Sequence, residues 1–265
     1  MDKIKKIVDK KKKEKIAALT AYDYSFGKIF SKNGIDFILV GDSLGMTILG
    51  NQDTLCVSID KIAYHTKSVR KGISNRKTLL ISDLPFATYF EKYDSIKNSS
   101  FLLQSGANMV KLEGNENWVL ETIKYLTERN IPVCGHIGLT PQSINMIGSY
   151  GIQYKENKKA KKLIEDSIKI QENGAKILFV ECIPAYLAKS ITESLDIPVI
   201  GIGAGPFTDG QILVMQDFLG ITEKKRTPFF AKNFLKKSTS IQNAVKIFIE
   251  DVKNKKFPEN QHTYF

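Results

Sequence analysis

Short apolar runs recur along this chain, and each ends abruptly in polar residues before a stretch with helical periodicity. The run at 37–40 is followed by Asp42, and the run at 78–81 closes on Asp83. A continuous apolar run of this length is typical of a strand buried on both faces, as in a parallel sheet. About eight such units fill the 265 residues, which predicts a single-domain α/β fold, a parallel (β/α)8 TIM barrel, with a short helical N-terminal leader.

The last third of the chain gives weaker signals. We interpret 208–218 as a short helix followed by a last short strand near 217–219, 231–253 as a helix, and the tail after Pro258 as loosely held. The glycines at 201–205 end a strand, where they form either a plain turn or a loop that binds an anion or an aromatic ring. An open doubly wound sheet is the alternative fold, but these glycines lack the full dinucleotide-binding spacing.

The formal net charge of +11 suggests a nucleic-acid partner. The lysines, however, are densest at 3–15 and 155–162, where they are typical of solvated helix faces and termini. Three scattered cysteines fit a reducing compartment, and no apolar run approaches the roughly 20 residues needed to span a bilayer. We therefore expect a cytoplasmic protein with no nucleic-acid partner and no membrane partner. A basic RNA-binding scaffold is the alternative from a different functional class.

Two aspartates lie at the ends of neighbouring predicted strands. Because the carboxyl ends of parallel strands meet at one rim of a barrel, we expect Asp42 and Asp83 to lie close together. Two carboxylates with open positions for water and substrate suit a hard divalent cation such as Mg²⁺, which would bind the ketone and carboxylate oxygens of a 2-oxo acid. In the alternative interpretation, each aspartate only caps the helix or turn that follows its strand.

Further charged residues belong to the same predicted mouth. Lys111 and Glu113 are two positions apart on a predicted strand, so both side chains would face the barrel interior. His136 and Glu181 come from later strands. Glu181 is a candidate base for the proton next to the carbonyl of the keto acid. The alternatives are a structural ion pair between Lys111 and Glu113 and a hydrogen-bonded His136 that positions a loop.

Several sequence motifs in this chain resemble those of one enzyme family, that of ketopantoate hydroxymethyltransferase (3-methyl-2-oxobutanoate hydroxymethyltransferase) in pantothenate biosynthesis. The motifs are spread over nearly the whole chain and include VGDSLGM at 40–46, GANMVKLEG at 106–114, PVCGH at 132–136, GLTPQS at 138–143 and GIGAG at 201–205. The chain departs from the family pattern at Pro206-Phe207 and at Gln216, before Asp217, which changes side chains on the expected folate side.

The resemblance implies a Mg²⁺-dependent barrel enzyme that transfers a hydroxymethyl group from the co-substrate 5,10-methylenetetrahydrofolate to 3-methyl-2-oxobutanoate, giving 2-dehydropantoate. It also implies a homo-oligomer, commonly a decamer. The implied site comprises the base Glu181, the keto-acid-binding residues Asp42, Ser43, Asp83, Lys111 and His136, the metal ligands Asp42, Asp83 and Glu113, and the folate-side residues Gly203, Ala204 and Gly205. A magnesium-dependent carbon–carbon lyase or phosphonate-forming mutase is the alternative enzyme class. That class would be favoured by a cysteine in the loop after the third strand, where this chain has Leu84-Pro85-Phe86.

Overall fold

A closed ring of eight parallel strands forms the centre of the computed structural model, which describes residues 3–75, 77–223 and 227–265. The strands follow one another in chain order, and the ring closes where β8 pairs with β1. They are β1 (Ile16–Thr20), β2 (Phe37–Val40), β3 (Leu79–Asp83), β4 (Met109–Glu113), β5 (Val133–Gly138), β6 (Ile177–Glu181), β7 (Val199–Ile202) and β8 (Gly210–Leu213). The predicted parallel (β/α)8 barrel is thereby confirmed.

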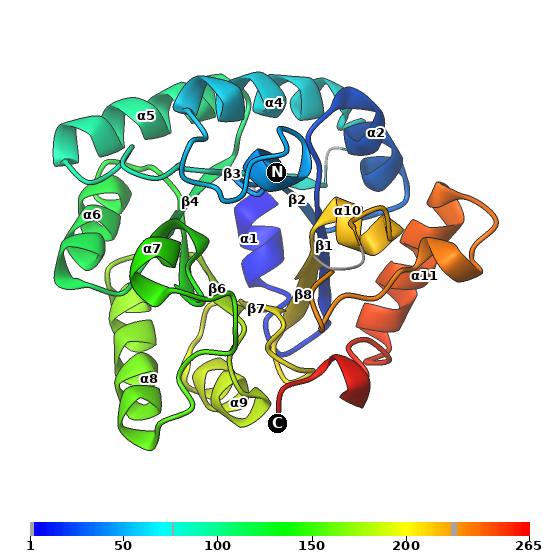
Figure 1. The fold of residues 1–265 in the computed structure, drawn as a ribbon. Coiled ribbons are helices and arrows are strands. Elements are labelled where there is room, and N and C mark those ends of the chain that lie inside the picture. Colours follow the sequence, from blue (N-terminus) through cyan, green and yellow to red (C-terminus); the bar gives the residue numbers. More distant parts are fainter. Residues whose placement is uncertain (1–2, 76, 224–226) are drawn as a thin grey trace.

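Helices surround this ring, as Figure 1 shows in a view into the barrel. The longer ones are α2 (Tyr24–Lys32), α4 (Ile59–Gly72), α5 (Lys92–Gln104), α6 (Asn117–Thr127), α8 (Asn157–Glu172), α9 (Ala185–Ser194) and α11 (Ile241–Lys253). Three short helices, α3 (Leu44–Thr47), α7 (Ile144–Ile147) and α10 (Met215–Leu219), lie in the loops after β2, β5 and β8. None of the described helices is long and apolar enough to cross a bilayer.

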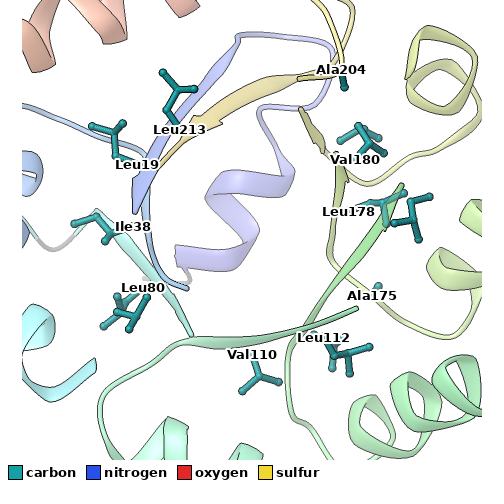
Figure 2. Packing of buried hydrophobic residues seen from close by; sticks show 14 of the residues in the cluster. Leu19, Ile38, Leu80, Val110, Leu112, Ala175, Leu178, Val180, Ala204 and Leu213 are labelled. Atoms are coloured by element: carbon teal, nitrogen blue, oxygen red, sulfur yellow. The ribbon is translucent and has the colours of Figure 1, made fainter. Parts of the chain in front are cut away.

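The apolar core has two layers, because successive strand residues point to opposite faces of the sheet. On β2, Phe37 faces the barrel interior and stacks on Phe179 of β6 with ring centroids 5.8 Å apart. Its neighbour Ile38 belongs to the layer between the strands and the helices, together with Leu19 and Leu80 (Figure 2). The continuous apolar runs of the sequence therefore reflect burial on both faces.

The leader forms helix α1 (Lys3–Val8), which closes the amino-terminal end of the barrel and is visible through its centre in Figure 1. Ile7 is buried among the side chains of the barrel interior. Lys10 forms an ion pair with Asp36 at 2.6 Å, and Lys11 forms one with Asp209 at 2.6 Å. Two lysines of the leader thus hold the N-terminal segment against the amino-terminal end of the barrel, so part of the positive charge has a structural role.

The predicted order of helix and strand after Thr208 is wrong. The strand comes first, as β8, and Asp217 lies in the following helix α10. The first residue of β8 is Gly210, and a side chain at this position would collide with the neighbouring strand. A Cβ atom there would lie 2.5 Å from the carbonyl oxygen of Ile16. Pairing with β1, which is distant in sequence, determines that 210–213 form a strand, and local periodicity does not reveal this pairing.

Two further predictions for the C-terminal part are corrected. Residues 231–240 are not part of the long helix, because α11 begins after Ser240, whose hydroxyl accepts a hydrogen bond from the backbone N–H of Asn243 at 3.1 Å. The tail after Pro258 is not loosely held. His262 is buried, and the carbonyl oxygen of Tyr264 accepts a hydrogen bond from the Ala185 N–H at 2.8 Å.

Candidate active site

A cavity of about 1090 Å³ opens at the carboxyl ends of the strands. The charged and polar residues singled out in the sequence all line it, namely Asp42, Ser43, Asp83, Lys111, Glu113, His136 and Glu181. They meet there because of the register of the ring, in which Asp83 is paired with Lys111 and Glu113 with His136. The tips of β2 to β6 thus contribute to one site.

Lys111 is the cation at the centre of this cluster. Its Nζ lies 2.8 Å from Asp83 Oδ1 and 3.4 Å from Glu113 Oε1. Burial disfavours the charged ammonium, but the negative charges of Asp83, Glu113 and Asp42 outweigh it and hold the pKa of Lys111 well above its usual value. The ion pair between Lys111 and Glu113 therefore exists, and it forms part of the site.

His136 lies between two glutamates. Its Nδ1 is 3.1 Å from Glu113 Oε1, and its Nε2 is 3.2 Å from Glu181 Oε2. Burial opposes protonation of the ring, but the Glu113 charge and hydrogen bonds raise the pKa of His136 to about 9. Burial also opposes ionisation of Glu113, yet Lys111 and His136 lower its pKa to about 2. At neutral pH the ring is an imidazolium that holds both carboxylates.

Asp42 and Asp83 are two neighbouring carboxyl groups at the ends of β2 and β3. The backbone N–H of Asp42 donates to Asp83 Oδ2 at 3.0 Å. The N-cap residues of the helices that follow β2 and β3 are Ser43 and Glu91, so neither aspartate caps its helix. Burial, and then the charges of Asp83 and Glu113, raise the pKa of Asp42 well above its usual value. The negative charges near Asp42 therefore exceed what the protein's own cations neutralise.

This charge excess fits a divalent cation between Asp42 and Asp83, because a bound cation offsets buried negative charge. Among the described residues there is no group of three or more acidic, histidine or cysteine side chains arranged to hold a metal ion. Both carboxylate oxygens of Glu113 already have protein partners. His136 and Lys111 contact Oε1, and Oε2 accepts a hydrogen bond from the backbone N–H of Gln142 at 3.0 Å. Carboxylate ligands from Asp42 and Asp83, with water and substrate oxygens completing the shell, would suit Mg²⁺. The role of Glu113 as a further metal ligand stays a prediction.

Gln142 is a site residue to which the sequence analysis gave no role, although it lies in the GLTPQS motif. Its amide Nε2 donates to Asp42 Oδ2 at 2.8 Å and to the Leu84 carbonyl at 3.0 Å. Its Oε1 accepts from the Tyr89 hydroxyl at 2.8 Å, which fixes which end of the amide faces Asp42. The side chain of Gln142 therefore orients one candidate metal ligand, and its backbone orients Glu113.

Ser43 and the glycine loop occupy different surroundings. The Ser43 hydroxyl lies 2.8 Å from the hydroxyl of Tyr22, and burial raises the pKa of Tyr22 to about 12.

Gly203 has φ +62°, and a Cβ atom there would lie 2.5 Å from the ring of Phe230. The described lining of the cavity includes Phe230 but none of the three residues 203–205, so this loop supports the wall from behind. Its predicted contact with the folate stays a prediction.

An eight-stranded parallel barrel with carboxylates, a lysine and a histidine gathered at the carboxyl ends of its strands is the arrangement of a (β/α)8-barrel enzyme. Residues 2–260 match the family model of ketopantoate hydroxymethyltransferase. The chain belongs to this family and is a hydroxymethyltransferase. Membership favours the transferase over the lyase, mutase and RNA-binding alternatives.

Individual relatives agree with this assignment. A 3-methyl-2-oxobutanoate hydroxymethyltransferase of Buchnera aphidicola subsp. Schizaphis graminum is 54% identical over 255 residues, which are 96% of this chain and 95% of the relative. The enzyme of the same name from Shewanella oneidensis is 51% identical over the same shares of each chain. Among solved structures, phosphonopyruvate hydrolase in complex with oxalate and Mg²⁺ has a TM-score of 0.64 and 12% identity over 86% of both chains. That likeness concerns the fold alone.

Proposed function

We propose that this protein converts 3-methyl-2-oxobutanoate, 5,10-methylenetetrahydrofolate and water into 2-dehydropantoate and tetrahydrofolate, and so supplies pantothenate biosynthesis. The observation that carries the proposal is that Glu181 lines the same cavity as the buried pair Asp42 and Asp83. The names of relatives that are 50–54% identical support the keto acid as substrate. The decameric assembly and cytoplasmic location implied by the resemblance belong to the same proposal.

Each charged group has a role in this reaction. Mg²⁺ bound by Asp42 and Asp83 would supply Lewis-acid polarisation of the keto acid, which makes the hydrogen on C3 more acidic. The Glu181 carboxylate removes this proton, and the electron pair left on C3 forms the new bond to the one-carbon unit. Water supplies the hydroxyl oxygen of the product, and tetrahydrofolate leaves.

Neighbouring residues orient and balance these groups. His136 Nε2, 3.2 Å from Glu181 Oε2, holds the base in the cavity. The Lys111 ammonium neutralises part of the charge of Asp83 and is placed to donate to an oxygen of the keto acid together with the Ser43 hydroxyl. The acidic cluster alone would repel an anionic substrate, so these donors and a divalent cation are needed for the keto acid to bind.

The proton-abstraction step can be tested without the folate. With Mg²⁺ present, we expect the C3 hydrogen of 3-methyl-2-oxobutanoate to exchange with D₂O, followed by NMR. Glu181→Gln should slow the exchange at least about 100-fold, as loss of a general base does. Asp83→Asn should raise the Mg²⁺ concentration needed for half-maximal exchange, whereas Glu172→Gln on the exposed end of α8 should match the unaltered protein.

Two results would remove parts of the proposal. Equal exchange by the Glu181→Gln variant would exclude Glu181 as the base. Exchange at an unchanged rate in EDTA would exclude a metal at Asp42 and Asp83.

A further inference from the structure

The cavity is much larger than a five-carbon keto acid requires. Its volume of about 1090 Å³ lies slightly above the roughly 300–1,000 Å³ of pockets that accommodate drug-sized ligands. The acidic cluster comes from β2 to β6, whereas another part of the wall is built by α10, the segment after it and the C-terminal tail. Figure 1 shows α10 at the opening, beside β1 and β8. The roles proposed above for binding the keto acid do not involve this part of the wall.

Two adjacent polar side chains of α10 line this part. Gln216 and Asp217 are each only 6% exposed, although both belong to the cavity lining. The Gln216 Oε1 atom is buried without a hydrogen-bond partner among the described residues. A buried acceptor left unpaired costs free energy comparable to a lost hydrogen bond, so such a group in a binding cavity points to a donor on the ligand.

Asp217 is held so that one oxygen remains available. Its Oδ1 accepts a hydrogen bond from the Thr222 hydroxyl at 2.6 Å, and no described residue donates to Oδ2. Gly220, with φ +67°, turns the chain after α10 so that Thr222 comes back to the carboxylate. Burial raises the pKa of Asp217 despite the Thr222 contact, as expected for a carboxylate with too few donors.

The surrounding wall is aromatic. Phe229 and Tyr264 both line the cavity, with ring centroids 5.3 Å apart, and Phe230, which follows Phe229 in the chain, also lines it. Phe229 remains 56% exposed, which leaves apolar surface available to a ligand. Flat rings bind well to such surfaces, because stacking adds to the burial of apolar area. The wall therefore combines acceptors and aromatic rings.

Acceptors on a carboxylate and an amide match a planar ligand edge that carries adjacent N–H and NH₂ donors. The 2-amino-4-oxopyrimidine part of a reduced folate has such an edge, and a carboxylate can accept from both donors at once. We propose that Asp217 and Gln216 bind this edge of the one-carbon donor, with Thr222 as the residue that positions the carboxylate. This inference rests on the proposed folate co-substrate and names the residues that recognise it.

The test measures binding of tetrahydrofolate and of 5-formyltetrahydrofolate to the full-length protein by calorimetry. Asp217→Asn keeps an acceptor for Thr222 but can place an NH₂ group against the donors of the ligand. We expect about 10- to 100-fold weaker binding, the factor for losing a hydrogen bond to a charged group. Gln216→Met should weaken binding about 2- to 10-fold. The matched control Asp60→Asn, at an exposed position on α4, should leave the affinity unchanged.

A second ligand keeps the test informative if the Asp217→Asn variant is unstable. A 5,8-dideazafolate with its 2-amino group should bind the unaltered protein at least about 10-fold more tightly than the counterpart with a 2-methyl group. In the Asp217→Asn variant, this preference should largely disappear.

The outcomes separate the two proposals. If the unaltered protein binds folates but Asp217→Asn and the 2-methyl analogue bind equally well, the assignment of Asp217 and Gln216 is overturned while the proposed function stands. If the unaltered protein binds no folate although it exchanges the C3 proton of the keto acid, both this inference and the folate part of the proposed function fail.

Discussion

Raising the pH from 6.5 to 9 should destabilise the metal-free protein through one residue, His136. The folded-state pKa of this ring is raised from 6.5 to about 9, because Glu113 and Glu181 contact its two nitrogens and outweigh the effect of burial. A raised folded-state pKa stabilises the fold fully below pH 6.5, and this contribution is lost as the pH rises through 9. At about 1.4 kcal/mol per pKa unit, the gap between 6.5 and about 9 corresponds to about 3 kcal/mol.

Two charged groups of the same cluster, Glu113 and Lys111, should not titrate in this range. Glu113, with a pKa of about 2, stays ionised, and Lys111 stays protonated because the carboxylates raise its pKa well above the usual value. The chain contains three histidines, so the imidazole signals can be resolved by NMR. Burial lowers the pKa of His262, and its signal should therefore titrate on the acidic side.

The assay combines urea unfolding in EDTA at a series of pH values with NMR titration of the imidazole C–H signals. One signal should titrate near pH 9 and be absent in His136→Gln, whose free energy of unfolding should be flatter between pH 6.5 and 9. The reasoning is refuted if every imidazole titrates at or below pH 7, or if the variant loses the same stability over this range as the unaltered protein.

Two further substitutions test residues that support the site, and both are measured by urea unfolding. Gln142→Met removes the amide donor to Asp42 and should reduce the free energy of unfolding by about 2–4 kcal/mol. It should also weaken Mg²⁺ binding, measured by calorimetry, about 10- to 100-fold. Unchanged Mg²⁺ affinity would show that the amide does not orient Asp42. Gly203→Ala should destabilise clearly more than Gly34→Ala, because both have positive φ, which costs about 1–2 kcal/mol, but only Gly203 has a ring, that of Phe230, within 2.5 Å of the added Cβ. Equal losses would mean that the Phe230 ring moves aside freely.

The sequence located most of the charged residues of the site because a parallel barrel ties position in the chain to position in space. A residue that follows an apolar strand run must lie at the carboxyl-end mouth, which applies to Asp42, Asp83 and Glu181. The spacing of Lys111 and Glu113 likewise predicted that both face inward, and the structure shows their ion pair. Family resemblance then attached roles to these residues, which geometry alone does not assign.

Residues in loops could not be located in this way. Gln142 follows β5 in a turn, and only the folded chain shows that it bridges Asp42 and Tyr89 from other segments. Gln216 and Asp217 lie on α10, whose second half, 217–219, is predicted as a strand because its short apolar pattern fits either structure. Residues this far apart in the chain meet through tertiary packing, so no local pattern records their contact.

By itself the amino-acid sequence determined the succession of buried strands and helices, and with it the barrel and the placing of acidic residues at one end, since apolar periodicity and strand polarity are local properties. Tertiary structure alone decided where the ring closes. It assigned β8 to Gly210–Leu213 by pairing with β1, and it set the pKa values of Glu113 and His136 by bringing the two side chains into contact. Both outcomes depend on contacts between distant segments, whose free energies exist only once the chain has folded.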